Sequence, residues 1–364
     1  MEFLKNSTNE MKRVLDRLKE DKLPVILFGA GDCGKNYIKV LNNYGIKIGC
    51  FCDDDIQKQK KKFYEYDVLS VEEAVSTRGG TILISSYGPK KLRDRLLAIS
   101  SELESRILWT DFYLWEDGLD YYEYYSNHSS ELLKVDSLLG DELSHKVFYN
   151  ILNYKISRNK ELIEEINDFG KEDQYFPSDI VEYVENEVFV DLGAYTGDTA
   201  INFAKHIARE NQSYKRIYAF EPDEKSFLML KRNTKAYENI AYIPKGAYSK
   251  NTQLRFYSEG FWTSTLSECG NIIVDVCKLD DEISDKVTFL KADIEGSEVE
   301  AIKGASGIIA RDCPKIAFCA YHKKDDIFRI PLALHNLNPN YVFYLRHYSE
   351  LPVETVVYAI DKRL

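Results

Sequence analysis

A glycine-containing segment just past the middle of the chain, Phe189–Thr199, combines residue types that could bind a cofactor. Its apolar start predicts a strand buried on both faces, and Asp191 follows at the carboxyl end, where open α/β sheets bind ligands. Gly193 and Gly197 lack a Cβ atom, so a ligand could lie against the backbone. An acid at the head of this D-x-G-x-x-x-G spacing would repel a phosphate, but it would suit an ammonium or a sulfonium group.

The residues that follow this loop extend the same interpretation. Either Asp198 or Thr199 could cap the next helix, whose free N–H groups would face an anionic group of the ligand. Glu221 ends the next predicted strand, where its carboxylate could accept hydrogen bonds from both hydroxyls of a ribose. A ribose, an amino-acid cation and no phosphate describe S-adenosylmethionine. The alternative is a tight turn and a surface acid that bind nothing.

Methyl transfer to an alcohol requires a base that removes the hydroxyl proton as the new bond forms. Asp293 and His322 follow the fourth and fifth predicted strands of this half, and we expect them on opposite sides of the methyl's path, one as general base. Glu295 would share a face with Asp293 if the strand continued that far. Arg346 and His347 could line the acceptor side. The alternative for His322 is a position in a solvated loop. For Arg346 and His347 the alternative is a side chain that points into solvent.

A metal ion is the less favoured alternative at this site. Asp293 and a neighbouring acid could hold a divalent cation, but the residues show no clear metal-ligand spacing. The sequence therefore predicts no metal ligands.

Another glycine loop, Leu27–Asn36, lies near the start of the chain. Gly29, Gly31 and Gly34 match the G-x-G-x-x-G pattern between a predicted strand and helix, and Asp53 ends the next strand, where a ribose-binding acid belongs. This pattern predicts either a nucleotide-sized ligand or a packing motif that binds nothing. The region has about four predicted strands, fewer than a full dinucleotide fold needs, which argues against hydride transfer.

Strands that alternate with helices predict α/β structure in both halves of the chain. In residues 1–112, an amphipathic helix up to Asp21 precedes about four parallel strands, which predicts a small Rossmann-like α/β domain. Residues 113–183 show helical spacing and predict a helical connector. In residues 184–364 the alternation resumes and ends in two strands that predict a hairpin, so the second sheet is expected to be mixed.

Four segments of the second half resemble the motifs of FkbM-type methyltransferases. They are FVDLGAYTGDTA, AFEPDEKSFLMLKRN, FLKADIEGSEVEAIKG and CAYHKKDDI, and the resemblance covers about Phe176 to Ile360. It implies a class I S-adenosylmethionine-dependent O-methyltransferase with the strand order 3-2-1-4-5-7-6, S-adenosylhomocysteine as product, and a sugar, glycan or similar polyhydroxylated acceptor. The residues expected to bind the cofactor are Asp191, Gly193, Ala194, Tyr195, Gly197, Asp198, Thr199, Glu221, Pro222, Gly246 and Ala247.

The overall composition excludes several classes of partner. A net charge of −11 without a compensating basic stripe argues against nucleic acid, and no apolar run is long enough to predict a membrane span. The first residues do not resemble a signal peptide. Seven cysteines without a CxxC pair predict reduced thiols in a cytoplasmic protein. Assembly as a homo-oligomer stays open.

The sequence as a whole thus predicts a cytoplasmic O-methyltransferase with a small-molecule or glycan acceptor. Two other functions stay open at this point. One is a nucleotide-sugar-binding oxidoreductase or epimerase run by the N-terminal domain, and the other is a non-catalytic protein built from two ligand-binding modules.

Overall fold

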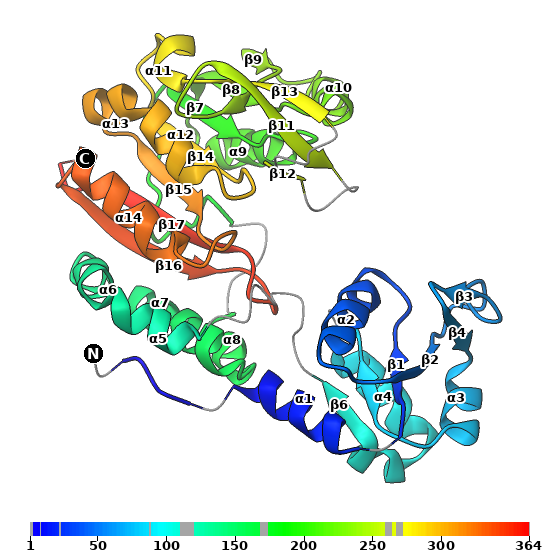
Figure 1. The fold of residues 1–364 in the computed structure, drawn as a ribbon. Helices are drawn as coiled ribbons and strands as arrows, with labels where there is room; N and C mark the ends of the chain where they lie inside the picture. Colours follow the sequence, from blue (N-terminus) through cyan, green and yellow to red (C-terminus); the bar gives the residue numbers. More distant parts are fainter. Residues whose placement is uncertain are drawn as a thin grey trace. The chain divides into compact units, whose positions relative to one another are not determined.

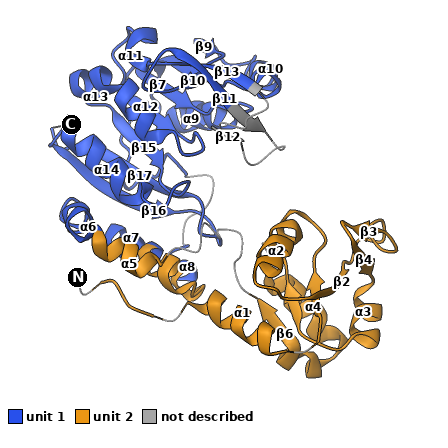
Figure 2. Ribbon diagram, in the orientation of Figure 1, with its two compact units in different colours: residues 1, 128–151, 163–364 blue, residues 2–127, 152–162 orange. Residues whose placement is uncertain are grey.

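Two compact α/β units make up the chain (Figure 1). The computed structural model describes residues 3–7, 9–21, 23–86, 89–109, 120–167, 174–258, 264–266 and 272–363. Unit 1 comprises residues 1, 128–151 and 163–364, and unit 2 comprises residues 2–127 and 152–162 (Figure 2). The expected connector, residues 113–183, is divided between the two units, and its residues 113–119 and 168–173 lie outside the described part. The three-part division of the chain stays a prediction.

The sheet of unit 2 has six strands in the order β3-β4-β2-β1-β5-β6. Their bounds are Val25–Phe28 (β1), Ile48–Cys52 (β2), Lys62–Phe63 (β3), Tyr66–Leu69 (β4), Ile82–Ile84 (β5) and Ile107–Trp109 (β6). Neighbouring strands are parallel except β3 and β4, which pair antiparallel. The expectation of about four strands is therefore too low, because β3 and β4 are short and largely polar.

Helices cover both faces of this sheet, because alternate residues of a buried strand point to opposite sides. Val25 and Leu27 of β1 pack with residues of α1 and α2, whereas Ile26 and Phe28 pack with residues of α3, α4 and a 3-10 helix. The bounds are Glu10–Glu20 (α1), Asp32–Asn43 (α2), Val71–Thr77 (α3), Pro89–Ile99 (α4) and Ser101–Arg106 (the 3-10 helix). Asn9 caps α1, so this helix begins later than its apolar spacing suggested.

Unit 1 contains a seven-stranded sheet in the order β16-β17-β15-β14-β7-β8-β9. Its strands are Glu187–Leu192 (β7), Tyr214–Phe220 (β8), Ile240–Ile243 (β9), Phe289–Ala292 (β14), Lys315–Cys319 (β15), Tyr341–His347 (β16) and Thr355–Asp361 (β17). β17 is antiparallel to both of its neighbours, and the other pairs are parallel. Read from β9, the strands give the order 3-2-1-4-5-7-6. The mixed sheet expected for a class I methyltransferase is confirmed.

Strand β7 forms the centre of this unit. It is buried along its whole length, and its Phe189 stacks on Phe203 of α9 with ring centroids 4.2 Å apart. The helices of the sheet region are Asp198–Arg209 (α9), Glu224–Asn233 (α10), Leu279–Glu282 (α11), Glu298–Gly304 (α12), Ser306–Asp312 (α13) and Asp326–Leu337 (α14). This packing fixes the end of β7, from which the predicted cofactor loop starts.

A four-stranded sheet that the sequence did not suggest also belongs to unit 1. Its order is β10-β13-β11-β12, with bounds Gly246–Ala247 (β10), Thr252–Ser258 (β11), Ser264–Leu266 (β12) and Ile272–Cys277 (β13). Between β6 and β7, the described residues form the helices Tyr121–Asn127 (α5), Ser129–Asp136 (α6), Glu142–Ser157 (α7) and Glu161–Glu164 (α8). Within the described residues, every helix is too short or too polar to cross a membrane.

Candidate active site

The predicted cofactor loop connects β7 to α9 and requires glycine at two positions. Gly193 has a φ of +75° and Gly197 a φ of +89°, a left-handed conformation that glycine adopts without strain. A Cβ atom at Gly193 would lie 2.0 Å from the backbone oxygen of Asp293, and one at Gly197 would lie 2.6 Å from Cγ2 of Thr234. The loop therefore packs directly against the residue that follows β14. This contact brings Asp293 next to the predicted cofactor loop.

Helix α9 begins without a side-chain cap. Gly197 is its N-cap residue and makes no side-chain cap hydrogen bond, so the expectation that Asp198 or Thr199 caps the helix is wrong. Ala194 is buried, while Tyr195 has a φ of +44° and is 40% exposed. The N-cap residue therefore supplies no side-chain acceptor for the first N–H groups of α9.

Asp191, the acid at the head of the loop, forms a buried ion pair. Its Oδ1 lies 3.0 Å from Nζ of Lys291 on β14, and both side chains are almost completely buried. Lys291 also donates to the backbone oxygens of Leu192 and Gly193, at 3.3 and 3.0 Å. Burial raises the pKa of Asp191 to about 6, so the carboxylate is ionised at neutral pH. The pair thus joins the two central strands to the loop, with Asp191 facing Lys291.

Glu221 lies at the end of β8 beside the same loop. Its Oε2 accepts a hydrogen bond from the backbone N–H of Tyr195 at 2.9 Å, and its Oε1 accepts one from Asp223 at 2.8 Å. Burial raises the pKa of Glu221 to about 7, although these two hydrogen bonds act to lower it. A carboxylate has about four lone-pair positions, so Glu221 keeps acceptor capacity for further donors.

The remaining predicted cofactor residues are Pro222, Gly246 and Ala247, and they lie near Glu221 in space. Pro222 follows it directly, and a Cβ atom at Gly246 would lie 3.8 Å from Cγ of Pro222. Gly246 and Ala247 form β10, which pairs with β13. The structure therefore brings the loop, Glu221 and this short strand together in unit 1.

Four ionisable side chains gather after the carboxyl ends of β14 and β15. His322 Nε2 lies 3.4 Å from Oδ1 of Asp293 and 3.6 Å from Oε2 of Glu295, and its Nδ1 lies 3.0 Å from Oε1 of Glu298. Tyr175 donates a hydrogen bond to Oδ2 of Asp293 at 3.0 Å. Asp293 and His322 are thus neighbours, and the expectation that they lie on opposite sides of a methyl's path is wrong.

The three carboxylates determine the charge of His322. Burial would lower the pKa of this imidazole, but the carboxylates raise it to about 10, so the ring is a cation at neutral pH. Burial would raise the pKa of Asp293, but the charges of His322 and Lys291 outweigh it and hold that pKa below its ordinary value. Burial raises the pKa of Glu295 to about 7. A protonated imidazole cannot accept a proton, so in this state proton acceptance falls to the carboxylates.

Glu298 is a candidate that the sequence analysis missed. It is fully buried in the first turn of α12, next to His322. Glu295 and Gly296 have φ values of +54° and +89°, so the chain reverses there and returns Glu298 toward the ends of the strands. Strand β14 ends at Ala292, and Glu295 therefore does not continue the face of the strand as the alternation suggested. In the sequence, the available indication of Glu298 was the segment DIEGSE, in which three acids surround one glycine.

Arg346 and His347, expected at the acceptor side, are buried in the fold. Nη2 of Arg346 lies 2.7 Å from Oδ2 of Asp141 and 2.6 Å from Oδ2 of Asp179. His347 is completely buried, and its Nδ1 lies 2.9 Å from Oγ1 of Thr355. The structure thus gives both side chains internal partners, and neither lies at an open surface. Arg346 joins β16 to Asp141, which directly precedes α7, and to Asp179.

In the first glycine loop, which lies in unit 2, two glycines pack directly against backbone oxygens. Gly29 has a φ of +119°, and a Cβ atom there would lie 2.5 Å from the backbone oxygen of Ser85. A Cβ atom at Gly34 would lie 2.6 Å from the backbone oxygen of Gly29, whereas one at Gly31 would meet nothing within 4 Å. Two of the three glycines are therefore explained by close strand–helix packing alone.

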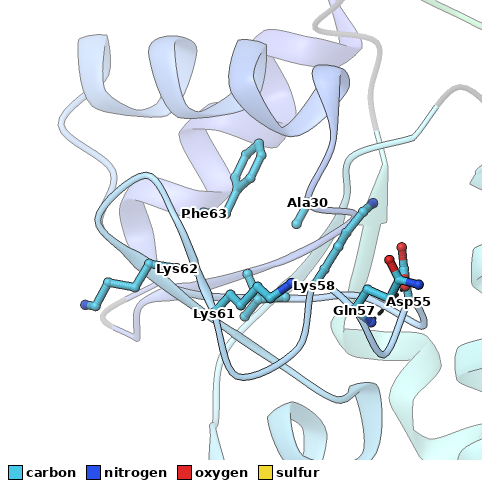
Figure 3. Close-up of a pocket in the computed structure, with 8 residues that line it drawn as sticks. Ala30, Asp55, Gln57, Lys58, Lys61, Lys62 and Phe63 are labelled. Carbon is cyan, nitrogen blue, oxygen red and sulfur yellow. Dashed lines mark hydrogen bonds between the residues drawn. The ribbon is translucent and has the colours of Figure 1, made fainter.

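Asp53, the predicted ribose-binding acid of this loop, already has internal donors. Its Oδ2 accepts from the backbone N–H of Ala30 at 2.9 Å and from Lys58 at 3.0 Å, and its Oδ1 accepts from the backbone N–H of Asp55 at 2.9 Å. A hollow of about 270 Å³ lies beside it (Figure 3). Its lining consists of Ala30, Asp55, Gln57, Lys58, Lys61, Lys62, Phe63 and Val68. Nucleotide binding at this loop stays a prediction.

Comparison with known proteins finds a family model that matches part of the second half of the chain. Residues 191–347 match the model of the methyltransferase FkbM domain. The chain is also similar to the crystal structure of methyltransferase FkbM from Methylobacillus flagellatus KT, with a TM-score of 0.77 and 22% identity over 97% of this chain and 94% of that chain. No curated protein matches the chain.

A more distant likeness is to fibrillarin from Aeropyrum pernix, solved with bound S-adenosyl-L-methionine. The TM-score is 0.33 and the identity 14%, over 52% of this chain and 74% of that chain, which is too weak to carry an argument. The family model, by contrast, spans the glycine loop, Glu221, the cluster around His322 and β16. Residues 191–347 are therefore similar to a methyltransferase FkbM domain.

Proposed function

We propose that this protein is an S-adenosylmethionine-dependent O-methyltransferase whose acceptor is a sugar, a glycan or a similar polyhydroxylated molecule. The proposal rests on the positions of two acids, Glu221 and Asp293, at the glycine loop. Glu221 lies at the glycine loop with acceptor capacity to spare, and Asp293, at the end of the neighbouring strand β14, touches the same loop. An acid suited to bind a ribose and a group that can accept a proton thus both contact the loop after β7, one from each neighbouring strand.

The loop residues fit the cofactor in their shape and in their free polar groups. Gly193 and Gly197 keep the loop free of side chains where it turns, and the uncapped N–H groups at the start of α9 favour an anionic group such as a carboxylate. Glu221 would accept hydrogen bonds from the ribose hydroxyls. Asp191 would act through its ion pair with Lys291, which fixes the loop.

When bound, S-adenosylmethionine supplies a methyl group on a positively charged sulfur. The protein's own part is to orient the acceptor hydroxyl and to take up its proton during attack. Asp293 and Glu295 are the carboxylates positioned for this, and both lie within 3.6 Å of His322. Tyr175 fixes Asp293 through its hydrogen bond. Several carboxylates at one site would also accept hydrogen bonds from neighbouring hydroxyls of a sugar.

The binding step is tested by isothermal titration of S-adenosylmethionine. We expect Glu221→Ala to weaken binding by about 1–3 kcal/mol, or roughly 5- to 150-fold, because it removes hydrogen bonds to a charged acceptor. Glu221→Gln keeps the size of the side chain and should show a smaller loss of the same kind. Glu224→Ala, at an exposed acid in the first turn of α10, should bind as the wild type does. Equal affinity in wild type and Glu221→Ala would remove Glu221 from the site.

The reaction is tested by incubating the protein with S-adenosylmethionine and a panel of sugars, nucleotide sugars and oligosaccharides. Mass spectrometry should find an added methyl group on an oxygen of one acceptor class, together with S-adenosylhomocysteine. A nicotinamide-dependent change in the sugar would instead support the oxidoreductase or epimerase. A protein that binds neither cofactor would be the non-catalytic alternative.

A further inference from the structure

We propose that Asp293, Glu298 and His322 form a binding site for one divalent transition-metal ion, of the Mn²⁺ or Zn²⁺ type. The site lies in unit 1 between the end of β14, the start of α12 and the residues after β15. The binding site itself is independent of the proposed function, and only its role in the reaction rests on that proposal.

The spacing of the three side chains suits a single ion. Each residue offers one ligand atom, and these atoms all lie within 4.8 Å of one another. An ion that binds nitrogen and oxygen atoms at about 2.0–2.6 Å spans at most about twice that distance between opposite ligands. The three atoms are therefore close enough to converge on one ion after small side-chain movements. Glu295, whose Oε2 is 3.6 Å from the ring of His322, could add a fourth oxygen.

The buried groups of this cluster are left with unused bonding capacity. Glu298 is fully buried, and its Oε2 has no hydrogen-bond partner among the described residues. The side chain of His322 is only 8% exposed, and its two nitrogens lie at ion-pair distance from carboxylates without forming a hydrogen bond within the described part of the chain. Buried polar atoms normally have partners. A metal ion would supply a partner for Oε2 of Glu298 and for one of the two ring nitrogens of His322.

The charges of the cluster also favour a divalent cation. Asp293, Glu295 and Glu298 place three carboxylates around one imidazole, so a singly charged ring leaves an excess of negative charge. A histidine that binds a metal is neutral, and the ion would replace the ring's proton as the positive charge. One imidazole with two or three carboxylates favours Mn²⁺ or Zn²⁺ over Ca²⁺ and Mg²⁺, which prefer oxygen ligands alone.

The position of the site suggests what the ion would do. Asp293 touches the cofactor loop through its backbone oxygen, which a Cβ atom at Gly193 would approach to 2.0 Å. A cation held by Asp293 would therefore be next to the proposed methyl donor. It could bind the acceptor hydroxyl and make that proton easier to remove.

Metal binding is tested directly on the full chain. The protein is stripped with a chelator and titrated with MnCl₂ in a calorimeter, and its metal content is measured after purification. We expect one Mn²⁺ per chain in the wild type and a loss of affinity of at least about tenfold in His322→Ala and in Glu298→Gln. His145→Ala removes a histidine that pairs with Asp136 at 2.7 Å elsewhere in unit 1, and it should bind Mn²⁺ as the wild type does. Unchanged binding in both cluster variants would overturn the proposal.

A second measurement does not depend on variants that could unfold. Pulsed electron paramagnetic resonance of the wild type with one equivalent of Mn²⁺ should show coupling to a nitrogen nucleus, as an imidazole ligand produces. A bound Mn²⁺ without nitrogen coupling would exclude His322 and contradict the site. S-adenosylmethionine titration of the chelator-treated protein separates the two proposals, because cofactor binding through Glu221 does not require the ion.

Discussion

His347 shows what burial does to a single titratable residue in this fold. The sequence suggested an exposed position near the acceptor, but the ring is completely buried beside Thr355. Burial lowers the pKa of His347 from 6.5 to about 4, although backbone hydrogen bonds act to raise it. The folded protein therefore holds a neutral imidazole over a pH range in which the unfolded chain binds a proton.

This shift predicts an acid-sensitive contribution to stability. Above a pH of about 6.5 the ring is neutral in both states and its titration has no effect. As the pH falls from about 6.5 to about 4, the unfolded chain gains a proton that the folded chain does not bind, so the free energy of unfolding decreases, by about 3 kcal/mol in all. His347→Gln lacks this titration. Chemical denaturation across this range should therefore show a steeper loss of stability in the wild type than in the variant, and parallel profiles would contradict a buried neutral ring.

At the scale of elements, the glycines of the two strand–helix loops show which positions serve packing and which leave space for a ligand. Gly29 closes the turn after β1 against the backbone of Ser85, and Gly193 closes the turn after β7 against Asp293. Gly31 is different, because a side chain there would point into open space. The G-x-G-x-x-G pattern therefore mixes structural positions with one that a ligand could approach.

We expect Gly29→Ala to destabilise unit 2 by more than about 2 kcal/mol. A φ of +119° is unfavourable for alanine, and its Cβ atom would lie 2.5 Å from a backbone oxygen that cannot easily move. Gly31→Ala has an extended backbone and free space, so it should change stability by only about 0.5 kcal/mol. Differential scanning calorimetry of both variants tests this difference. Similar losses in the two would mean that the loop adopts another conformation.

The same elements show what the sequence could and could not predict. Apolar strands that alternate with helices were sufficient for the two α/β units, because strand burial and crossover rules act locally. The strand order of the second sheet was implied by the resemblance to FkbM-type methyltransferases. The glycines and Glu221 followed from motif spacing. The contact between His322 and Glu298 did not, because it depends on the left-handed turn at Glu295 and Gly296. The burial of Arg346 likewise depends on Asp141 and Asp179, which are distant in the sequence.

At the scale of the whole molecule, each unit has its own sheet and its own apolar core. The core of unit 2 is formed by residues of α1, α2 and β1 and, on the other face, of α3 and α4. The core of unit 1 is formed around β7, α9 and β14. Helix α7 contributes residues to both units. Separate cores allow the two units to differ in stability and to respond separately to a ligand.

Calorimetry with S-adenosylmethionine tests this independence. A ligand that binds only folded unit 1 stabilises that unit by about 2.7 kcal/mol at a free concentration of 100 times Kd, which for a unit of this size raises its transition by roughly 5–10 °C. The transition of unit 2 should not move. Glu221→Ala should reduce the shift, and Gly29→Ala should lower the other transition alone. If both transitions rise together with S-adenosylmethionine, the units unfold as one cooperative structure, which the continuous α7 would then couple.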